Sequence, residues 1–342
     1  MSGETNRQWR LARRPVGDIG EGDLEFAQSP APQAGPGQVR VRTLILSMDP
    51  TNRIWMSDAK QYMPPVKVGD VMRGVTLGVV DQSNADGYAP GDLVSGMWGW
   101  QDYATVDVAK MPLAKLPADR TLPLPGYVAL VGGVGMTAYF GLLDIGRPQP
   151  GETLVVSAAA GAVGSLVGQI GKIKGCRVIG IAGSAEKCRW ITEELGFDGA
   201  INYRDEDVGA ALDRLAPDGI DIDFENVGGP IMGEIFARLR LNARIALCGL
   251  ISQYNAEGPV QGPANFEQVL MQRATIKGFI ILDYAARFPE AMHDLIAWHA
   301  AGKIKYQTDI VQGLENAAAT VKKLFEGGNT GKLMVQVADL PD

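Results

Sequence analysis

The sequence contains very few residues of the types that bind zinc or serve as acid–base catalysts. Among 342 residues there are three cysteines, Cys176, Cys188 and Cys248, and two histidines, His293 and His299. The cysteines lack C-x-x-C spacing, and the histidines stand six residues apart, so they do not share a helix face at i, i+4. We therefore expect no metal site, and we find neither a G-x-S-x-G segment nor a Ser-His-Asp set.

The chain also lacks a basic block, a disulfide framework and a secretion signal. Lys and Arg number 32 against 39 Asp and Glu, a net charge of −7 spread along the chain, so neither nucleic acid nor an anionic membrane is an expected partner. A sparse, odd set of cysteines and an N-terminus without an apolar core favour the cytoplasm. No uninterrupted apolar run approaches the roughly 18 residues of a membrane span, and we expect no membrane partner.

The remaining patterns indicate two domains of the α/β class. At roughly 100–200 residues per domain, this length suggests two. The first third carries short strand-like runs separated by Gly and Pro, which is typical of a β-rich, barrel-like unit. From residue 153, short apolar runs alternate with helical patterns, which indicates βαβ units and a doubly wound parallel sheet. The expected strands are 38–47, 71–80, 91–100, 102–111, 153–158, 177–182, 199–203, 220–227, 243–250, 274–282 and 331–337, the last of which is expected to return to the first domain.

A glycine-containing turn follows the first strand of the alternating region, in TLVVSAAAGAVGSLVGQIGKIKG. Gly161 would let the backbone approach a pyrophosphate, and Gly164 would let the helix pack closely on the strand. Ala162 and Val163 lie between them at the helix N-terminus, where exposed N–H groups attract phosphate. Alanine replaces the first glycine of G-x-G-x-x-G. The strand–turn–helix context favours dinucleotide binding over the alternative, in which the glycines serve packing alone.

The end of the second alternating strand indicates which dinucleotide is bound. An NAD site usually has a carboxylate there, for the ribose 2′-OH. Here Ser184 and Lys187 follow the strand, and they suit a 2′-phosphate because phosphate needs charge-assisted donors. We therefore favour NADP(H), with the alternative that Lys187 is a solvated helix residue. Tyr203, at the end of the third strand, either covers the adenosine side or packs on the strand.

Without a metal or an acid–base histidine, the reaction needs a substrate that is already electrophilic. A carbonyl conjugated to a C=C bond meets this requirement. Hydride from a nicotinamide adds at the β-carbon, and charge develops on the carbonyl oxygen as an enolate. One well-placed hydrogen-bond donor stabilises that charge.

Several motifs in a fixed order give nearly the whole chain a family resemblance. They are SMDPTNRIWM, KQYMPPVKVGDVMRG, GMTAYFGL, SAAAGAVGS, AGSAEK, GFDGAINY, ENVGG, CGLISQYN and NTGKLMVQV. The sequence resembles the zinc-independent medium-chain dehydrogenase/reductases, in the prostaglandin reductase / leukotriene B4 12-hydroxydehydrogenase group with curcumin reductase and plant double-bond reductases. The resemblance implies a GroES-like substrate domain over 1–122 completed by 311–342, a Rossmann NADP-binding domain over 123–310, and a cleft between them.

The resemblance also implies a function, namely NADPH-dependent reduction of the α,β double bond of enones and enals. An NADPH quinone oxidoreductase and a non-catalytic NADPH-binding protein are the alternatives. A Thr-Asn pair within DPTNR stands where relatives commonly carry an aromatic residue and Met, and this bears on substrate shape. The resemblance further suggests a homodimer, formed through 274–281 as an edge strand.

Individual residues receive roles from the resemblance. Tyr254 would act through the nicotinamide ribose 2′-OH to stabilise and protonate the enolate, and Tyr62 would line the substrate mouth as a second candidate catalytic residue. Asn226 and Asn329 would lie at the cofactor. Thr137 is either a nicotinamide contact or domain-interface packing. For both tyrosines the alternative is a half-buried aromatic ring with a satisfied hydroxyl.

Overall fold

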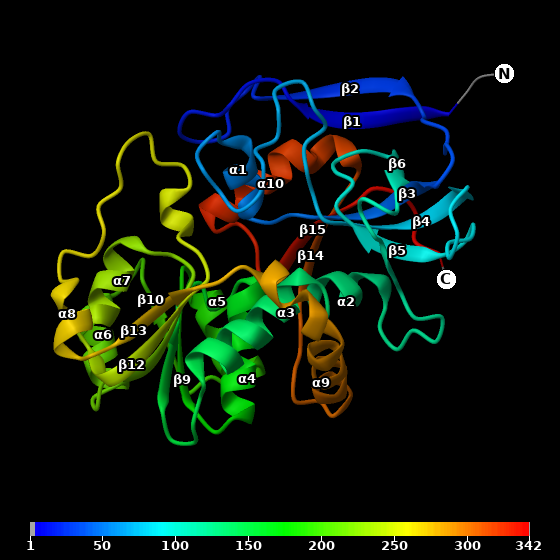
Figure 1. Cartoon of the computed structure of the whole chain (residues 1–342). Coiled ribbons are helices and arrows are strands. Elements are labelled where there is room, and N and C mark those ends of the chain that lie inside the picture. The colour runs from blue at the N-terminus through cyan, green and yellow to red at the C-terminus, as the bar shows by residue number, and fades with distance from the viewer. Residues whose placement is uncertain (1–3, 342) are drawn as a thin grey trace. The chain divides into compact units, whose positions relative to one another are not determined.

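The computed structural model describes residues 4–341 and divides into two compact units (Figure 1). The first unit contains the chain up to Pro125, Asp309–Gly328 and the chain from Leu333 onward, and the second contains Gly126–Thr308 and Asn329–Lys332. The resemblance implied that all of 311–342 completes the first domain, whereas Asn329–Lys332 belongs to the second unit. The reason is local, because the Gly331 amide donates to the Ala160 carbonyl at 2.9 Å.

A largely antiparallel sheet forms the centre of the first unit. Its strands are ordered β14-β15-β3-β4-β5-β7, and β6 pairs with β3. The C-terminal strand pairs antiparallel with β3, so that Val335 faces Leu46. The strands are β3 (Gln38–Ser47), β4 (Thr76–Ser83), β5 (Leu93–Gly96), β6 (Tyr103–Asp107), β7 (Ala114–Lys115), β14 (Thr308–Gln312) and β15 (Lys332–Gln336).

Two strands at the start of the chain were not predicted. β1 (Thr5–Leu11) and β2 (Leu24–Pro30) form a separate antiparallel pair. Their sequences, TNRQWRL and LEFAQSP, contain too few apolar residues to show a strand pattern. Tertiary contacts hold β1 in place, since the Trp9 indole donates to the Leu314 carbonyl at 2.8 Å. The helices of this unit are α1 (Thr51–Met56) and α10 (Ala317–Glu326), the latter preceded by the 3-10 turn η5 (Leu314–Asn316).

The second unit is a parallel six-stranded sheet, which confirms the predicted doubly wound fold class. The strand order is β10-β9-β8-β11-β12-β13. Strands β9 and β10 are added on one side of β8, and β11 to β13 are added on its other side, as in a Rossmann sheet. The strands are β8 (Thr153–Val156), β9 (Arg177–Ala182), β10 (Gly199–Asn202), β11 (Ile220–Glu225), β12 (Leu239–Leu247) and β13 (Thr275–Gly278). The helical elements are α3 (Gly133–Phe140), η1 (Gly141–Gly146), α4 (Ala162–Ile173), α5 (Ala185–Arg189), η2 (Trp190–Glu194), α6 (Val208–Leu215), α7 (Gly229–Phe236), η3 (Ile251–Gln253), α8 (Glu267–Met271), η4 (Ile281–Arg287) and α9 (Phe288–Ala300).

The last strand of the parallel sheet departs from its prediction. The strand expected over 274–282 is shorter, because only β13 pairs with the sheet and a 3-10 turn begins at Ile281. β13 is the edge strand of the sheet, so the apolar residues after it have no neighbouring strand to hold them extended.

The expectation that no apolar run approaches the length of a membrane span is wrong. The helical stretch Leu124–Gly146, which starts with α2 (Leu124–Ala129), is long and apolar enough by length and composition to cross a membrane. Glycines at positions such as Gly132 and Gly135 interrupt its side-chain pattern, and this concealed the apolar character of the stretch in the sequence. Of its most apolar window, 67% is buried inside the protein, as is typical of a core helix.

Candidate active site

The predicted glycine turn joins β8 to α4 at the carboxyl edge of the parallel sheet. Gly161 precedes the first residue of α4, and no side chain caps this end of the helix among the described residues. The amides of Ala162, Val163 and Gly164 therefore belong to the first helical turn, where no intrahelical acceptor is available. Such amides, together with the helix dipole, favour a phosphate. The turn begins at Ala158, which has a left-handed φ of +49°.

Gly164 packs as the sequence predicted. A Cβ at this position would lie 2.5 Å from the Ala158 carbonyl oxygen and 2.9 Å from the Ala159 Cα. Any side chain would therefore push α4 away from the end of β8. At Gly161, in contrast, a Cβ would meet only the Ala158 oxygen, at 3.1 Å. Internal packing thus explains the glycine at 164 better than the one at 161, where close approach of a ligand to the backbone stays a prediction.

The NTGK segment lies against this glycine turn. Gly331 forms a parallel bridge with Gly161, and the side-chain nitrogen of Asn329 donates to the Gly331 carbonyl at 3.0 Å. Asn329 is thus held in a turn beside the N-terminus of α4, although it stands more than 160 residues away along the chain. The structure brings these two motifs together. Sequence reasoning did not single out Gly331, which makes the contact.

Ser184, Lys187 and Tyr203 gather where β9 and β10 end. The Ser184 hydroxyl caps α5 by accepting from the Lys187 amide at 3.2 Å, which leaves its own proton able to bond a ligand oxygen. Tyr203 lies over the turn, since a Cβ on Gly183 would lie 2.9 Å from its hydroxyl oxygen. Tyr203 is 42% exposed, whereas Glu186, the nearest carboxylate in the sequence, lies within α5. The strand end therefore offers a hydroxyl, a cation and an aromatic face.

Replacing Lys187 with alanine should weaken NADPH binding about 10- to 100-fold, because a charge-assisted hydrogen bond contributes about 1.5–3 kcal/mol. NADH, which has no 2′-phosphate, should bind as it does to the unchanged protein. Fluorescence titration with both nucleotides measures the two affinities. Lys303→Ala removes the same charge from an exposed site on the same unit and serves as the control. Equal losses for NADPH and NADH would remove Lys187 from the phosphate site.

Asn226 is fixed at the end of β11 by its neighbours. Its side-chain nitrogen donates to the Ser157 carbonyl at 2.7 Å, and its backbone amide donates to the Ser157 hydroxyl at 2.8 Å. The buried Glu225 carboxylate accepts from that same hydroxyl at 2.7 Å and from the Gly228 amide at 2.9 Å. Burial raises the pKa of Glu225, and these hydrogen bonds oppose the rise. Sequence reasoning missed Ser157 and Glu225, which together hold the ends of β8 and β11.

Tyr254 follows β12 and is linked to the Asn226 turn. The Ile251 amide donates to the Asn226 carbonyl at 3.1 Å, and Ile251 starts the 3-10 turn that leads to Tyr254. The Tyr254 hydroxyl oxygen accepts from the Leu250 amide at 3.0 Å, which orients the ring. The glycine turn, Asn329, Asn226 and Tyr254 therefore belong to one edge of the Rossmann sheet, where strand order reverses and ligands of such sheets bind.

Tyr62 belongs to the first unit, in the loop after α1, and is 41% exposed. Its hydroxyl oxygen lies 2.5 Å from the Thr51 hydroxyl and accepts from the Trp55 indole at 3.0 Å. Arg73 lies over the Trp55 ring, with its guanidinium carbon 5.4 Å from the centroid. Sequence reasoning did not link Thr51 or Trp55 to Tyr62, although the two stand four residues apart on one helix.

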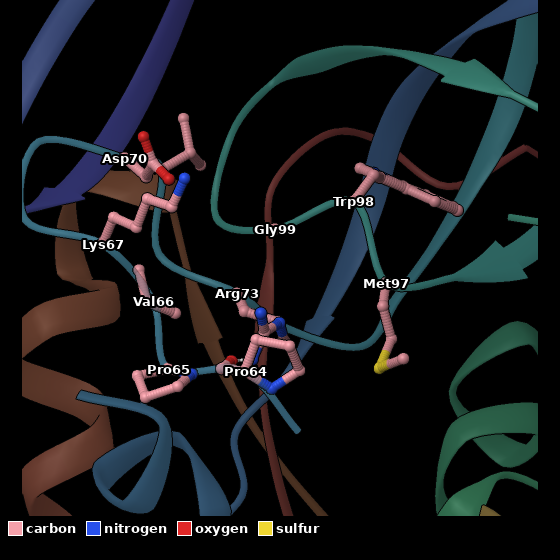
Figure 2. A pocket seen from close by; sticks show the side chains of 10 residues that line it. Pro64, Pro65, Val66, Lys67, Asp70, Arg73, Met97, Trp98 and Gly99 are labelled. Atoms are coloured by element: carbon pink, nitrogen blue, oxygen red, sulfur yellow. Dashed lines mark hydrogen bonds between the residues drawn. The ribbon is translucent and has the colours of Figure 1, made fainter. Parts of the chain in front are cut away.

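A pocket of about 280 Å³ opens beside this group in the first unit (Figure 2). Figure 2 shows Lys67 and Asp70 on one side of it, and Arg73 near Pro64, to whose carbonyl Arg73 donates at 2.8 Å. The pocket includes none of the residues predicted for the site. Its lining is Pro64, Pro65, Val66, Lys67, Asp70, Val71, Arg73, Met97, Trp98 and Gly99.

Within residues 4–341, no hydrogen bond links the Thr137 side chain to another candidate site residue. Its hydroxyl donates to the Gly133 carbonyl at 2.7 Å, one turn back along α3. This bond is the usual way for a threonine inside a helix to satisfy its hydroxyl. The Thr137 hydroxyl thus has an acceptor within its own helix, and both roles expected for this residue stay predictions.

The cysteines are poor nucleophiles in this structure. Burial raises the pKa of Cys176 to about 11 and that of Cys248 to about 12. Thiolates, the reactive form, are therefore scarce near neutral pH. In the part of the chain that the structure describes, no group of three or more His, Cys, Asp or Glu side chains is arranged to hold a metal ion.

A Rossmann sheet with a glycine turn, in a chain that also builds an antiparallel β unit, defines the class of two-domain, dinucleotide-dependent oxidoreductases. Two family models match the chain, described as the N-terminal domain of oxidoreductase over residues 7–113 and as zinc-binding dehydrogenase over residues 162–298. The chain belongs to the medium-chain dehydrogenase/reductase family, in its zinc-independent branch.

Relatives of known activity match this chain over nearly its whole length. The NADPH-dependent curcumin reductase of Escherichia coli is 45% identical over 341 residues, 98% of each chain. The NADP(+)-dependent 2-alkenal reductase of Nicotiana tabacum is 39% identical over 340 residues, again 98% of each. CurA from Vibrio vulnificus, solved in complex with NADPH, has a TM-score of 0.91 and 45% identity over 98% of this chain and 100% of its own.

Proposed function

We propose that the protein is an NADPH-dependent reductase of the carbon–carbon double bond of α,β-unsaturated ketones and aldehydes. The observation that carries this function is the edge of the parallel sheet, where the glycine turn and the NTGK turn lie at the end of β8 and the Ser184–Lys187 cap lies at the end of β9. Relatives at 45% and 39% identity that span the whole chain are a curcumin reductase and a 2-alkenal reductase. The cofactor is NADP(H).

The residues at this edge fit NADP(H) chemically. The uncapped first turn of α4, at Gly161–Gly164, would hold the pyrophosphate through backbone amides. Ser184 and Lys187 would hold the 2′-phosphate, and Tyr203 would cover the adenosine side. Asn226 and Asn329 would contact the nucleotide at the sheet edge. When bound, NADPH supplies the hydride that reduces the β-carbon of the substrate.

The chain supplies the proton and the charge stabilisation. As hydride is added at the β-carbon, negative charge develops on the substrate carbonyl oxygen. Tyr254 is the proposed donor that stabilises this enolate and, through the ribose 2′-OH, delivers the proton. Tyr62 is proposed to place a second phenol hydroxyl at the substrate. Neither residue requires a metal ion, so conjugated carbonyls, which are already electrophilic, are the substrates that this set of groups can reduce.

The function is tested by following NADPH oxidation with a panel of 2-alkenones, 2-alkenals and quinones. We expect turnover with the alkenones and alkenals, and saturated ketones or aldehydes as the products. Oxidation with quinones alone would favour a quinone reductase instead. Tight NADPH binding without turnover of any compound would indicate a non-catalytic protein.

We also propose that the protein forms a homodimer through the exposed edge strand β13. Apolar side chains are exposed around this strand, with Leu270 at 72%, Phe266 at 57%, Met271 at 56% and Leu241 at 53%. Such a patch and an unpaired strand edge favour pairing with a second copy. Sedimentation equilibrium should give twice the chain mass of 36.5 kDa, and Leu270→Asp should shift the protein toward the monomer. A monomeric parent protein would contradict this assembly.

The proposed location is the cytoplasm. Support comes from the composition, since three cysteines in 342 residues are too few and too scattered for a disulfide framework. Cell fractionation with an antibody against the chain is the test, and recovery in a membrane or secreted fraction would overturn the proposal.

A further inference from the structure

We infer that Thr51 and Trp55 are positioning residues that both donate hydrogen bonds to the Tyr62 hydroxyl oxygen and so direct the Tyr62 proton toward the substrate. The inference rests on the proposed function, because it gives Tyr62 a donor role in the reduction of enones. It adds two residues that sequence reasoning did not assign to the chemistry. It also assigns the direction of the short hydrogen bond between Thr51 and Tyr62.

The local geometry makes the two donors converge on one oxygen. Thr51 and Trp55 stand at i and i+4 on α1, so their side chains project from the same helix face. The Thr51 hydroxyl lies 2.5 Å from the Tyr62 oxygen, and the Trp55 indole nitrogen lies 3.0 Å from it. An indole N–H can only donate, so the phenol oxygen is the acceptor in its bond with Trp55.

The Thr51 contact admits either direction, and the reaction distinguishes them. If Tyr62 donates to Thr51, its only proton is occupied and cannot reach a substrate oxygen. If Thr51 donates, the phenol oxygen accepts two hydrogen bonds, and its own O–H stays available. Two accepted bonds also polarise the phenol and strengthen it as a donor, because hydrogen bonds in a chain reinforce one another. The second arrangement is the one we assign.

The surroundings keep Trp55 in the orientation that this requires. Trp55 is 3% exposed, and Arg73 lies over its ring at 5.4 Å in a cation–π contact. Arg73 is itself held by its bond to the Pro64 carbonyl at 2.8 Å and by the Asn52 side chain, which donates to the Arg73 carbonyl at 3.3 Å. Tyr62, in contrast, is 41% exposed, so its hydroxyl has an open side for a ligand.

The test compares Thr51→Val, which removes the hydroxyl at nearly constant volume, with Thr51→Ser, which retains it. With an alkenone that the parent protein reduces, Thr51→Val should lower kcat about three- to tenfold, the worth of one hydrogen bond, with a smaller change in KM. Thr51→Ser should remain within about twofold of the parent, as the loss of a methyl group alone predicts. Thr105→Val makes the same change on β6, where Thr105 is half-buried, and should leave kcat unchanged.

The decisive readout is the double-mutant cycle with Tyr62→Phe. If Thr51 acts through Tyr62, Thr51→Val should have no further effect on kcat once the phenol hydroxyl is absent. The inference would be overturned if Thr51→Val lowered kcat by the same factor with and without the Tyr62 hydroxyl. It would also be overturned if Thr51→Ser failed to retain the parent kcat, or if Tyr62→Phe were as fast as the parent. In each of these cases enone reduction itself would still stand. If the parent reduces no enone or enal, the proposed function fails first and the inference fails with it.

Discussion

Replacing Tyr254 with phenylalanine is expected to lower kcat for an enone about 100-fold, which is the lower end of what a positioned general acid contributes. KM and the affinity for NADPH should change much less, because the hydroxyl acts on charge that develops only in the transition state. Steady-state kinetics combined with NADPH titration separates these quantities. The hydroxyl now accepts from the Leu250 amide at 3.0 Å, so its loss also removes one turn contact.

A control separates the chemical role of Tyr254 from that structural one. The Tyr88 hydroxyl also bonds to backbone, donating to the Leu113 carbonyl at 2.9 Å. Tyr88→Phe therefore removes a comparable backbone contact far from any candidate site residue in the sequence, and kcat should not change. If Tyr254→Phe and Tyr88→Phe both leave kcat unchanged, Tyr254 is a packing residue.

Replacing Asp223 with valine is expected to stabilise the protein by about 1–3 kcal/mol, the usual cost of burying a polar group without a hydrogen bond. Asp223 is 0% exposed on β11, and within residues 4–341 neither carboxyl oxygen has a hydrogen-bond partner. Its register partners are Val155 and Ile245, both members of an apolar cluster. Valine suits this buried strand position. Thermal melts of both proteins give the difference.

The pH dependence of stability provides a second readout. Burial, followed by the nearby Glu225 charge, raises the pKa of Asp223 well above its usual range. The folded protein therefore keeps a proton on Asp223 that the unfolded chain releases above about pH 4. The free energy of unfolding should consequently fall as the pH rises from that value toward the folded-state pKa, and Asp223→Val should lose this part of the slope.

Asp221 on the same strand is the matched control. It accepts from the Thr153 amide at 2.9 Å and forms an ion pair with Arg240 at 3.1 Å. Removing a carboxylate with partners leaves those partners unsatisfied, so Asp221→Val should destabilise the protein. A destabilised Asp223→Val, similar to Asp221→Val, would show that Asp223 has a stabilising role that its surroundings do not explain.

The sequence was most informative where a pattern and a backbone requirement coincide. The run TLVVSAAAGAVG predicts the strand, the turn and the helix, and Gly164 packs against Ala158 as expected. Ala159 replaces the first glycine of the motif, and a glycine elsewhere in the chain makes room for its methyl group. A Cβ on Gly180 would come within 2.7 Å of the Ala159 methyl, so the glycine on β9 makes room for it.

What the sequence did not predict depends on contacts between distant segments. β1 has a mostly polar sequence, and its hydrogen-bond partners Leu314 and Trp100 are remote from it in the chain. The contact of Gly331 with Gly161 joins residues 170 positions apart. The pairing of Thr51 with Tyr62 depends on a loop conformation that no periodicity encodes. Patterns report local structure, and these features are set by tertiary packing instead.

The destination of the hydride tests the central claim most directly. The protein should be supplied with NADPH deuterated on the transferred face of C4 and with 4-phenyl-3-buten-2-one, and the product examined by NMR. The account predicts 4-phenyl-2-butanone with one deuterium on the β-carbon and an intact carbonyl. An allylic alcohol with deuterium on the carbinol carbon, or no product while NADPH remains bound, would contradict it.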